Sequence, residues 1–212
     1  MALSFDLFGT LVATDRPEEP WDAVAAALSA RSVHVPEGWE DAYRSAHREY
    51  DRGQEAPLDE HVRLALASRG IEITEETAAE AVLDAFDSPV TVHEGAIDVL
   101  AAAAQRGPVG MCSNCSVPGL VERTLDRADI ESESGQTFDV VITSVGCGWR
   151  KPHQRIFAAT ADALGVGISD LVHVGDDART DGGAGRAGAQ SILLDDHSLP
   201  AIAEKLREGE LC

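Results

Sequence analysis

Four short segments of this chain combine residue types suited to the transfer of a charged group. Asp6 interrupts the apolar run "SFDLFGTLV", where a lone buried carboxylate is costly unless the fold uses it. Ser113 ends a second apolar run, Lys151 stands in "GWRKPHQRIF", and Asp176 lies in "VGDDARTD". A carboxylate that attacks a phosphate needs cations nearby, because both groups are negatively charged. The segments therefore predict phosphoryl transfer through an aspartyl intermediate on Asp6.

The same segments supply a metal site and supporting groups. Asp6 and Asp176 can share a magnesium ion, a hard cation that prefers oxygen ligands and retains several waters. Ser113 and Lys151 can bind the phosphoryl oxygens as their charge shifts in the transition state. Asp181 can orient a metal-bound water or hold the lysine in place.

Neighbouring residues extend the predicted site. The backbone N–H groups of the turn Gly9-Thr10 are expected to face an anion, as turn amides do. Asn114 adds an amide beside the serine, and we assign it with Thr10 to substrate binding. Pro152 fits the first turn of a helix, which would hold Lys151 at the helix entrance.

Each residue also has a purely structural explanation. A serine after a strand is commonly a helix cap, and Asp176-Asp177 can begin a helix whose dipole favours acids. Asp6 is the exception, because a solitary acid at the end of an apolar strand has no evident structural use. The four segments together, in this order, favour a functional site.

The segments "FDLFGTL", "MCSN", "KPHQRIF" and "VGDDARTDGGAGRAGA" resemble the four motifs of the haloacid dehalogenase-like hydrolase superfamily. The resemblance extends from residue 2 to about residue 194. It implies that Asp6 is the nucleophile and that Ser113 and Lys151 bind the transferred group. It also makes Asp176 the acidic metal ligand and Asp181 the supporting acid.

Phe8 departs from the phosphatase pattern of that superfamily. Phosphatases usually carry a second aspartate there, which protonates the leaving oxygen, while the backbone carbonyl at that position ligates magnesium. The resemblance therefore keeps Phe8 as a metal ligand, with Asp6 and Asp176, but removes the acid. An aromatic residue, more often tyrosine, is typical of the 2-haloacid dehalogenase branch, in which the departing halide needs no proton.

The acids of the fourth segment favour the phosphatase alternative. Asp176 and Asp177 are expected near Asp6, where carboxylates without a cation repel one another and raise a pKa. The dehalogenase branch works without metal and needs an arginine near its substrate, but "WDAVAAALSAR" has none before Arg31. We therefore favour a magnesium-dependent phosphatase of a small phosphorylated metabolite. A 2-haloacid dehalogenase acting through an aspartyl ester, and a binding or regulatory protein of low activity, remain the alternatives.

An alternation of strand and helix patterns positions these segments. Apolar runs predict strands at 2–8, 107–113, 138–144, 171–177 and 191–196, with helices at 95–106, 117–128, 153–164 and 198–207. This order predicts an α/β fold with a Rossmann-like parallel sheet of five or more strands and helices on both faces. Ligands of such sheets bind at the carboxyl ends of the strands.

Residues 14–91 break the alternation, with several helical patterns and no convincing strand. We predict a core of residues 1–13 and 92–212 and an all-helical cap of residues 14–91 over the site. One cap histidine can replace the missing acid, although packing within the cap is the favoured role for each of the candidates Trp21, Trp39, Tyr43, His47 and His61.

Composition bounds the partners. The 37 acidic and 17 basic residues give a net charge of −20, which disfavours nucleic acid and resembles proteins adapted to molar salt. We expect a cytoplasmic location, because the sequence suggests neither a signal peptide nor a membrane span. The cysteines at 112, 115, 147 and 212 are expected to be structural thiols. The expected partner is a small-molecule substrate, and the oligomeric state is left open.

Overall fold

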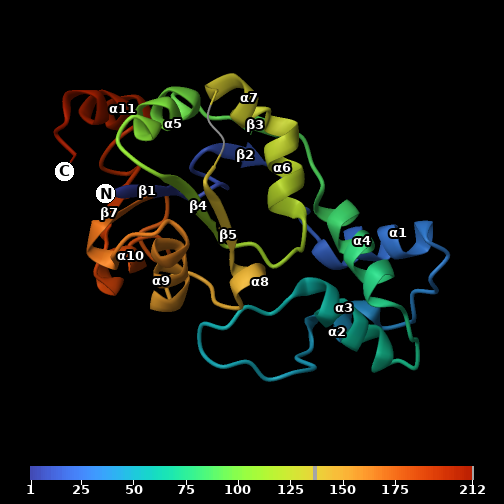
Figure 1. Ribbon diagram of the computed structural model, residues 1–212. Helices are drawn as coiled ribbons and strands as arrows, with labels where there is room; N and C mark the ends of the chain where they lie inside the picture. Colours follow the sequence, from blue (N-terminus) through green and yellow to red (C-terminus); the bar gives the residue numbers. More distant parts are fainter. Residues whose placement is uncertain (136–137, 212) are drawn as a thin grey trace.

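Five apolar segments form one parallel sheet, in the order β5-β4-β1-β6-β7 (Figure 1). The fold is described by a computed structural model of residues 1–135 and 138–211. The strands are β1 (Ala2–Phe5), β4 (Val109–Ser113), β5 (Val140–Thr143), β6 (Leu171–Gly175) and β7 (Gln190–Leu193). β1 is central, with Leu3 in register with Val109 on one side and Val172 on the other. β1, β4 and β6 are buried throughout, which explains their nearly continuous apolar sequences.

Helices cover both faces of the sheet, which confirms the predicted fold class (Figure 1). α5 (Ala96–Ala104) and α11 (Leu199–Glu208) pack together on one face, and α9 (Gln154–Ala163) and α10 (Gly183–Ala187) lie on the other. The remaining core elements are α6 (Leu120–Ala128), α7 (Ile130–Ser134), α8 (Ser144–Cys147) and the 3-10 turn η1 (Ile168–Asp170).

The prediction for Pro152 is wrong. α9 begins at Gln154, and His153 precedes it as the N-cap, accepting a hydrogen bond from the Arg155 amide at 3.3 Å. Pro152 and Lys151 therefore belong to the loop before the helix. His153, the first residue of the predicted helix, is its N-cap, so the helix begins two residues after the proline.

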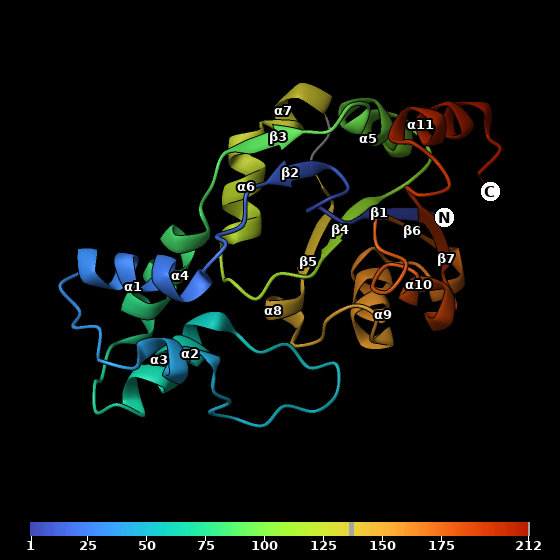
Figure 2. The same ribbon diagram turned by 180° about the vertical axis from the view of Figure 1, so that it is seen from behind.

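Residues 14–91 contain four helices: α1 (Pro20–Ala30), α2 (Trp39–Arg44), α3 (Leu58–Ala67) and α4 (Glu75–Phe86). We call residues 20–86 the helical insertion. Figure 2 shows its helices grouped to one side of the core. The chain enters and leaves it through an antiparallel pair, β2 (Val12–Thr14) and β3 (Val90–Val92), with Val12 in register with Val92. The prediction of no strand within 14–91 is thus wrong at its two ends, where β-branched residues of both boundary segments pair.

Two polar residues occupy the interior of the sheet. Ser4 of β1 and His173 of β6 are in register and fully buried. Adjacent residues in register point to the same face, so these side chains meet between apolar neighbours. Among the described residues, no helix has the length and apolar character needed to cross a membrane.

Candidate active site

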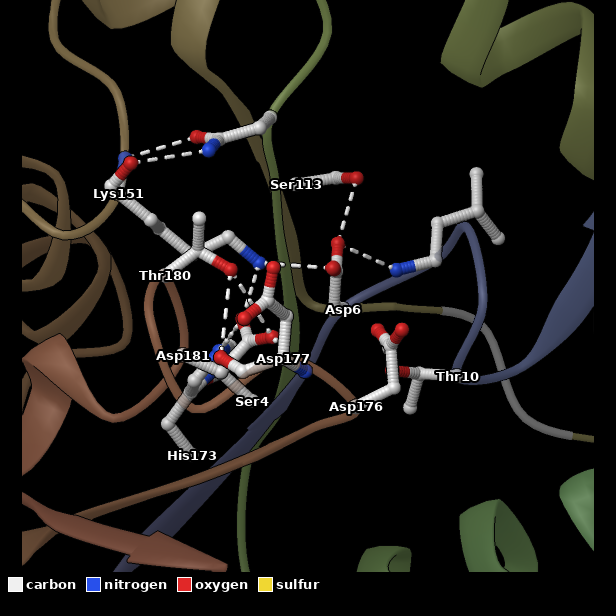
Figure 3. Close-up of polar contacts among 12 residues, drawn as sticks. Ser4, Asp6, Thr10, Ser113, Lys151, His173, Asp176, Asp177, Thr180 and Asp181 are labelled. Atoms are coloured by element: carbon white, nitrogen blue, oxygen red, sulfur yellow. Dashed lines mark hydrogen bonds and ion pairs between the residues drawn. The ribbon is translucent and has the colours of Figure 1, made fainter. Parts of the chain in front are cut away.

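The carboxyl ends of β1, β4 and β6 meet around Asp6 (Figure 3). Asp6 follows β1 directly, and its backbone N–H donates to the carbonyl of Val174 at 2.9 Å. The Ser113 hydroxyl, at the end of β4, donates to Asp6 Oδ1 at 2.7 Å, and the Leu7 amide donates to the same oxygen at 2.8 Å. Asp6 is 8% exposed, so its carboxylate is nearly buried and is held in place by these donors.

Lys151 bridges Asp6 and a second acid. Its ammonium lies 3.0 Å from Asp6 Oδ2 and 2.5 Å from Asp181 Oδ1, with its side chain fully buried. Burial alone would lower the pKa of Lys151, but the charges of Asp6 and Asp181 outweigh it and raise the pKa above its ordinary value. The lysine is therefore a permanent cation beside Asp6.

His173 is a site residue that the sequence analysis missed. Its Nε2 lies 3.0 Å from Asp181 Oδ1, and its Nδ1 lies 2.9 Å from the Ser4 hydroxyl (Figure 3). Burial lowers the pKa of His173, so the ring is neutral at pH 7, donates from Nε2 to the carboxylate and accepts from Ser4. A histidine within an otherwise apolar strand was the available signal.

The Asp181 carboxylate accepts hydrogen bonds from several groups, more than an acid in the first turn of a helix needs. Besides Lys151 and His173, the Asp177 amide donates to its Oδ2 at 3.0 Å. Burial alone would raise the pKa of Asp181, but the His173 hydrogen bond and the Lys151 charge hold it well below its ordinary value. Of the two predicted uses of Asp181, the contacts fit holding the lysine in place.

Asp176 is half-buried and carries uncompensated charge. The Thr10 hydroxyl donates to its Oδ1 at 3.1 Å. Burial, and then the negative charge of Asp6, raise the pKa of Asp176. Gly9, at φ +85°, lies so close that a Cβ there would stand 2.5 Å from Asp176 Oδ2, so the turn requires glycine.

The acids fit a divalent cation. One oxygen from each of Asp6, Asp176 and Asp181 lies within 4.8 Å of the others. Three carboxylates and the one ammonium of Lys151 leave a formal charge of −2, because His173 is neutral. Hard oxygen donors and this excess charge match a cation such as magnesium.

The amides of the Gly9-Thr10 turn have other partners than the sequence predicted. The Gly9 and Thr10 amides donate to the carbonyls of Val12 and Leu7, at 2.8 and 3.3 Å, so they do not face an anion as predicted. These two hydrogen bonds close the turn within itself.

Asn114 and Asp177 also bind within the chain. The Asn114 side chain accepts from the Lys151 amide at 2.7 Å and donates to the Lys151 carbonyl at 3.0 Å, so it fixes the lysine's backbone. Asp177 was expected near Asp6 and lines the same cavity, but its partly exposed carboxylate pairs with Arg179 at 2.9 Å. The third acid of the close group is Asp181.

A cavity of about 410 Å³ opens over Asp6 and Asp176. Its wall is apolar along Phe8, Phe86 and Leu120. Three arginines that the sequence analysis did not select also line it: Arg16, Arg150 and Arg179. Arg150 directly precedes Lys151, and Arg179 lies in the segment "VGDDARTD", so both had a local signal. Arg16 had none and reaches the cavity through the path of its loop.

The aromatic and histidine candidates of the helical insertion pack against one another instead. Among the described residues, none of the five candidates lines the cavity. His47 Nε2 lies 2.7 Å from the Ala42 carbonyl, and His61 Nε2 lies 2.6 Å from the Tyr43 carbonyl. Trp39 is buried and makes an edge contact with Tyr43. The structure thus supports the packing role and places neither histidine at the reacting centre.

The cysteines that the structure describes are free thiols. Burial raises the pKa of Cys112 to about 12 and that of Cys115 to about 11, so both are protonated at neutral pH. This favours the predicted structural role. Cys212 lies outside the described residues.

The protein is of the α/β class, with a parallel sheet and with paired acids at the carboxyl edge of that sheet. The family model for haloacid dehalogenase-like hydrolases matches residues 1–188. The chain belongs to this family, as its motifs indicated. No curated protein matches the sequence.

Solved structures with this fold include both phosphatases and dehalogenases. A HAD phosphatase from Thermococcus onnurineus is 19% identical with a TM-score of 0.57, over 99% of this chain and 97% of that one. An L-2-haloacid dehalogenase from Xanthobacter autotrophicus is 24% identical with a TM-score of 0.53, over 100% and 84%. The HAD hydrolase YfnB from Bacillus subtilis, bound to magnesium, is 15% identical with a TM-score of 0.55, over 93% and 89%. These similarities show the fold alone.

Proposed function

We propose that this hydrolase is a magnesium-dependent phosphatase of a small phosphorylated metabolite. The excess charge of −2 around Asp6, with the raised pKa of Asp176, is the observation that carries the proposal. A cluster of this charge repels an anionic substrate unless a cation joins it. Asp6, Asp176 and the carbonyl of Phe8 are the proposed ligands. When bound, magnesium would neutralise the carboxylates and the phosphate oxygens.

The residues around Asp6 suit two successive displacements at phosphorus. In the first, an Asp6 oxygen forms a bond to phosphorus while the ester P–O bond breaks and its electron pair leaves with the alcohol oxygen. In the second, a water oxygen forms a bond to phosphorus while the bond between phosphorus and the Asp6 oxygen breaks, which restores the carboxylate; the protons of the water leave with the phosphate. Ser113 and Lys151, within 2.7 and 3.0 Å of Asp6, are placed to donate to the phosphoryl oxygens in both steps. Asp181 keeps the lysine charged and in place.

Phe8 shapes the choice of substrate. Its side chain carries no proton for the leaving oxygen, and it lines the cavity beside the nucleophile. A phosphate ester with a good leaving group is the least affected by the lack of an acid. The cavity volume of about 410 Å³ limits the substrate to a small molecule.

The second candidate is a 2-haloacid dehalogenase. Phe8 and the apolar wall along Phe86 and Leu120 favour it, because a departing halide needs no proton. In that reaction an Asp6 oxygen would displace halide from carbon and form an ester. Arg16, Arg150 and Arg179 in the cavity wall also suit its anionic substrate. The uncompensated charge of Asp176 beside the reacting carboxylate opposes it, since the substrate is itself an anion. A binding protein of low activity is the third alternative, resting on the same missing acid.

One assay separates the three. Phosphate release from p-nitrophenyl phosphate is measured with magnesium and with chelator, and chloride release from 2-chloropropionate is measured beside it, both in high salt. We expect phosphate release that chelator abolishes and that Asp6→Asn removes. Chloride release insensitive to chelator would overturn the proposal in favour of the dehalogenase. The absence of both activities would favour the binding protein.

Phe8→Asp tests the missing acid. The variant keeps the backbone carbonyl and restores a proton donor beside the leaving oxygen, so we expect faster hydrolysis of alkyl phosphates, by about 10²-fold. Hydrolysis of p-nitrophenyl phosphate should change less, because its leaving group needs little protonation. An unchanged alkyl phosphatase rate in a folded variant would contradict this account of Phe8.

A further inference from the structure

One loop of the helical insertion reaches across to the core beside the site. Residues 51–58, which we call the strap, lie between α2 and α3 and run past α8 and α9 (Figures 1 and 2). The Glu55 amide donates to the Gly148 carbonyl, and the Arg150 amide donates to the Gly53 carbonyl, each at 3.0 Å. The strap is therefore paired with the segment that leads directly into Lys151.

The strap carries a buried carboxylate that has only one long ion pair, with a partly exposed arginine. The Glu55 side chain is 2% exposed, and its nearest cation, Arg150 Nη1, is 3.8 Å away. Its other partners are the Ser144 hydroxyl and the Ala56 amide, the latter at 3.1 Å. Burying a carboxylate costs several kcal/mol in lost hydration unless well-placed hydrogen-bond donors or cations compensate for it. The buried position of this carboxylate in a loop therefore directs attention to the groups that it binds.

Ser144 transmits the contact to the loop after β4. Its hydroxyl proton has two acceptors in reach, the Glu55 carboxylate and the Cys115 carbonyl at 3.2 Å, and the carboxylate is the closer. The Ser144 oxygen accepts the Cys115 amide at 2.9 Å. Cys115 follows Asn114, whose side chain holds both backbone polar groups of Lys151. Glu55 thus braces both loops that flank the proposed nucleophile, those of Ser113 and Lys151.

The close approach of the strap is built into its sequence. Gly53 has φ +90°, and a Cβ there would stand 2.8 Å from Cδ2 of His153. Only glycine allows this conformation and this contact without strain. At the other end of the strap, the Leu58 amide donates to the Ser116 carbonyl at 2.9 Å, which adds a second attachment to the loop after β4.

We propose that Glu55 is a positioning residue for the reaction, through which the helical insertion sets the geometry of Ser113 and Lys151. This inference rests on the proposed function of those two residues. Glu55 does not line the cavity and touches neither Asp6 nor the substrate space. Loss of the contact should therefore lower kcat and leave KM nearly unchanged, since a displacement of about 1 Å in catalytic groups lowers rates by about 10²-fold.

The test compares Glu55→Ala, Glu55→Gln and a control, Glu60→Ala. Glu60 is an acid of α3, and among the described residues its ion pair and hydrogen bonds are to Arg48 and Tyr50, within the helical insertion. With p-nitrophenyl phosphate and magnesium, we expect Glu55→Ala to lower kcat at least about tenfold with KM within about threefold. Glu55→Gln, which still accepts from Ser144, should stay within about threefold of the parent. Glu60→Ala should match the parent.

A second measurement does not depend on activity. Amide hydrogen exchange is followed at Cys115 and Lys151, and melting temperatures are recorded for all variants. We expect faster exchange at both amides in Glu55→Ala alone. If the parent enzyme releases no phosphate but this exchange pattern appears, the proposed function is wrong, whereas the fixing of the Ser113 and Lys151 loops by Glu55 is supported. A Glu55→Ala variant with parental kcat and parental exchange overturns the inference. So does a Glu55→Gln variant as impaired as Glu55→Ala.

Discussion

The carboxyl edge of the sheet and the aromatic cluster of the helical insertion both contain side chains that could transfer protons, but these side chains have different kinds of partner. We define the aromatic cluster as Trp39, Tyr43, His47 and His61. At the sheet edge, charged side chains bind one another across distant segments. In the cluster, the histidine nitrogens bind main-chain carbonyls of the same region.

The two regions differ in whether their polar side chains have partners that satisfy their hydrogen bonds and balance their charge. Each histidine of the aromatic cluster bonds a carbonyl within its own region, and no pair of acids is forced together there. At the sheet edge, Lys151 is shared between two acids, and Asp176 has only a hydroxyl as partner. Excess buried charge of one sign is unfavourable for folding, so its presence favours a ligand. The balance of charge in the structure thus agrees with the roles expected from the sequence, a site at the sheet edge and packing in the aromatic cluster.

Asp6→Asn is the change with the largest expected effect. It keeps the size and the hydrogen bond from Ser113 but removes the nucleophile, so turnover should fall about 10³-fold or more. Phosphate release at saturating p-nitrophenyl phosphate measures it, with circular dichroism to show that the fold persists. Residual turnover near the parental rate would place the reacting centre elsewhere and remove the contrast between the regions.

Lys151→Met tests the charge balance of the sheet edge by stability. Removing one partner of a buried ion pair leaves Asp6 and Asp181 without a cation, so the free energy of unfolding should fall by about 3–5 kcal/mol. Urea unfolding provides the value. The matched control is Arg207→Met, which breaks an exposed pair with Asp98 and should cost less than about 1 kcal/mol. Equal losses in the two variants would contradict a special role for burial.

His173→Gln tests the buried histidine through pH. The folded pKa of His173 lies below its unfolded value, so the unfolded chain binds the proton more readily and stability rises with pH between the two values. Acidification below about pH 6.5 should therefore destabilise the parent, by at most about 1.4 kcal/mol per pH unit from this group. Unfolding curves between pH 7 and pH 5 should be flatter in the variant. An identical slope would show that His173 is not held neutral.

His47→Ala and His61→Ala have the smallest expected effects. Each variant loses one hydrogen bond to a carbonyl and should lose about 1 kcal/mol of stability. The turnover of folded enzyme should remain that of the parent, because neither ring lines the cavity. A tenfold loss of kcat in either variant, of the order expected for a lost proton donor, would erase the distinction between the two regions and revive the histidine as the missing acid.

The sequence by itself determined the sheet and the segments at its edge. Strands such as β1 and β6 are short apolar runs that end at an acid, and that pattern is local in the chain. Because parallel strands end at one edge, it also predicted that Asp6, Ser113 and Asp176 would converge. The amphipathic spacing of α5, α9 and α11 was equally visible, to within a few residues of each end.

Only the tertiary structure decided which polar side chains became partners. Ser4 and His173 are 169 residues apart, and Glu55 and Ser144 are 89 apart. Such pairs depend on register and loop paths, which no local pattern encodes. Propensity and periodicity act over a few residues, whereas hydrogen bonding and charge balance are settled by whichever segments the completed fold brings together.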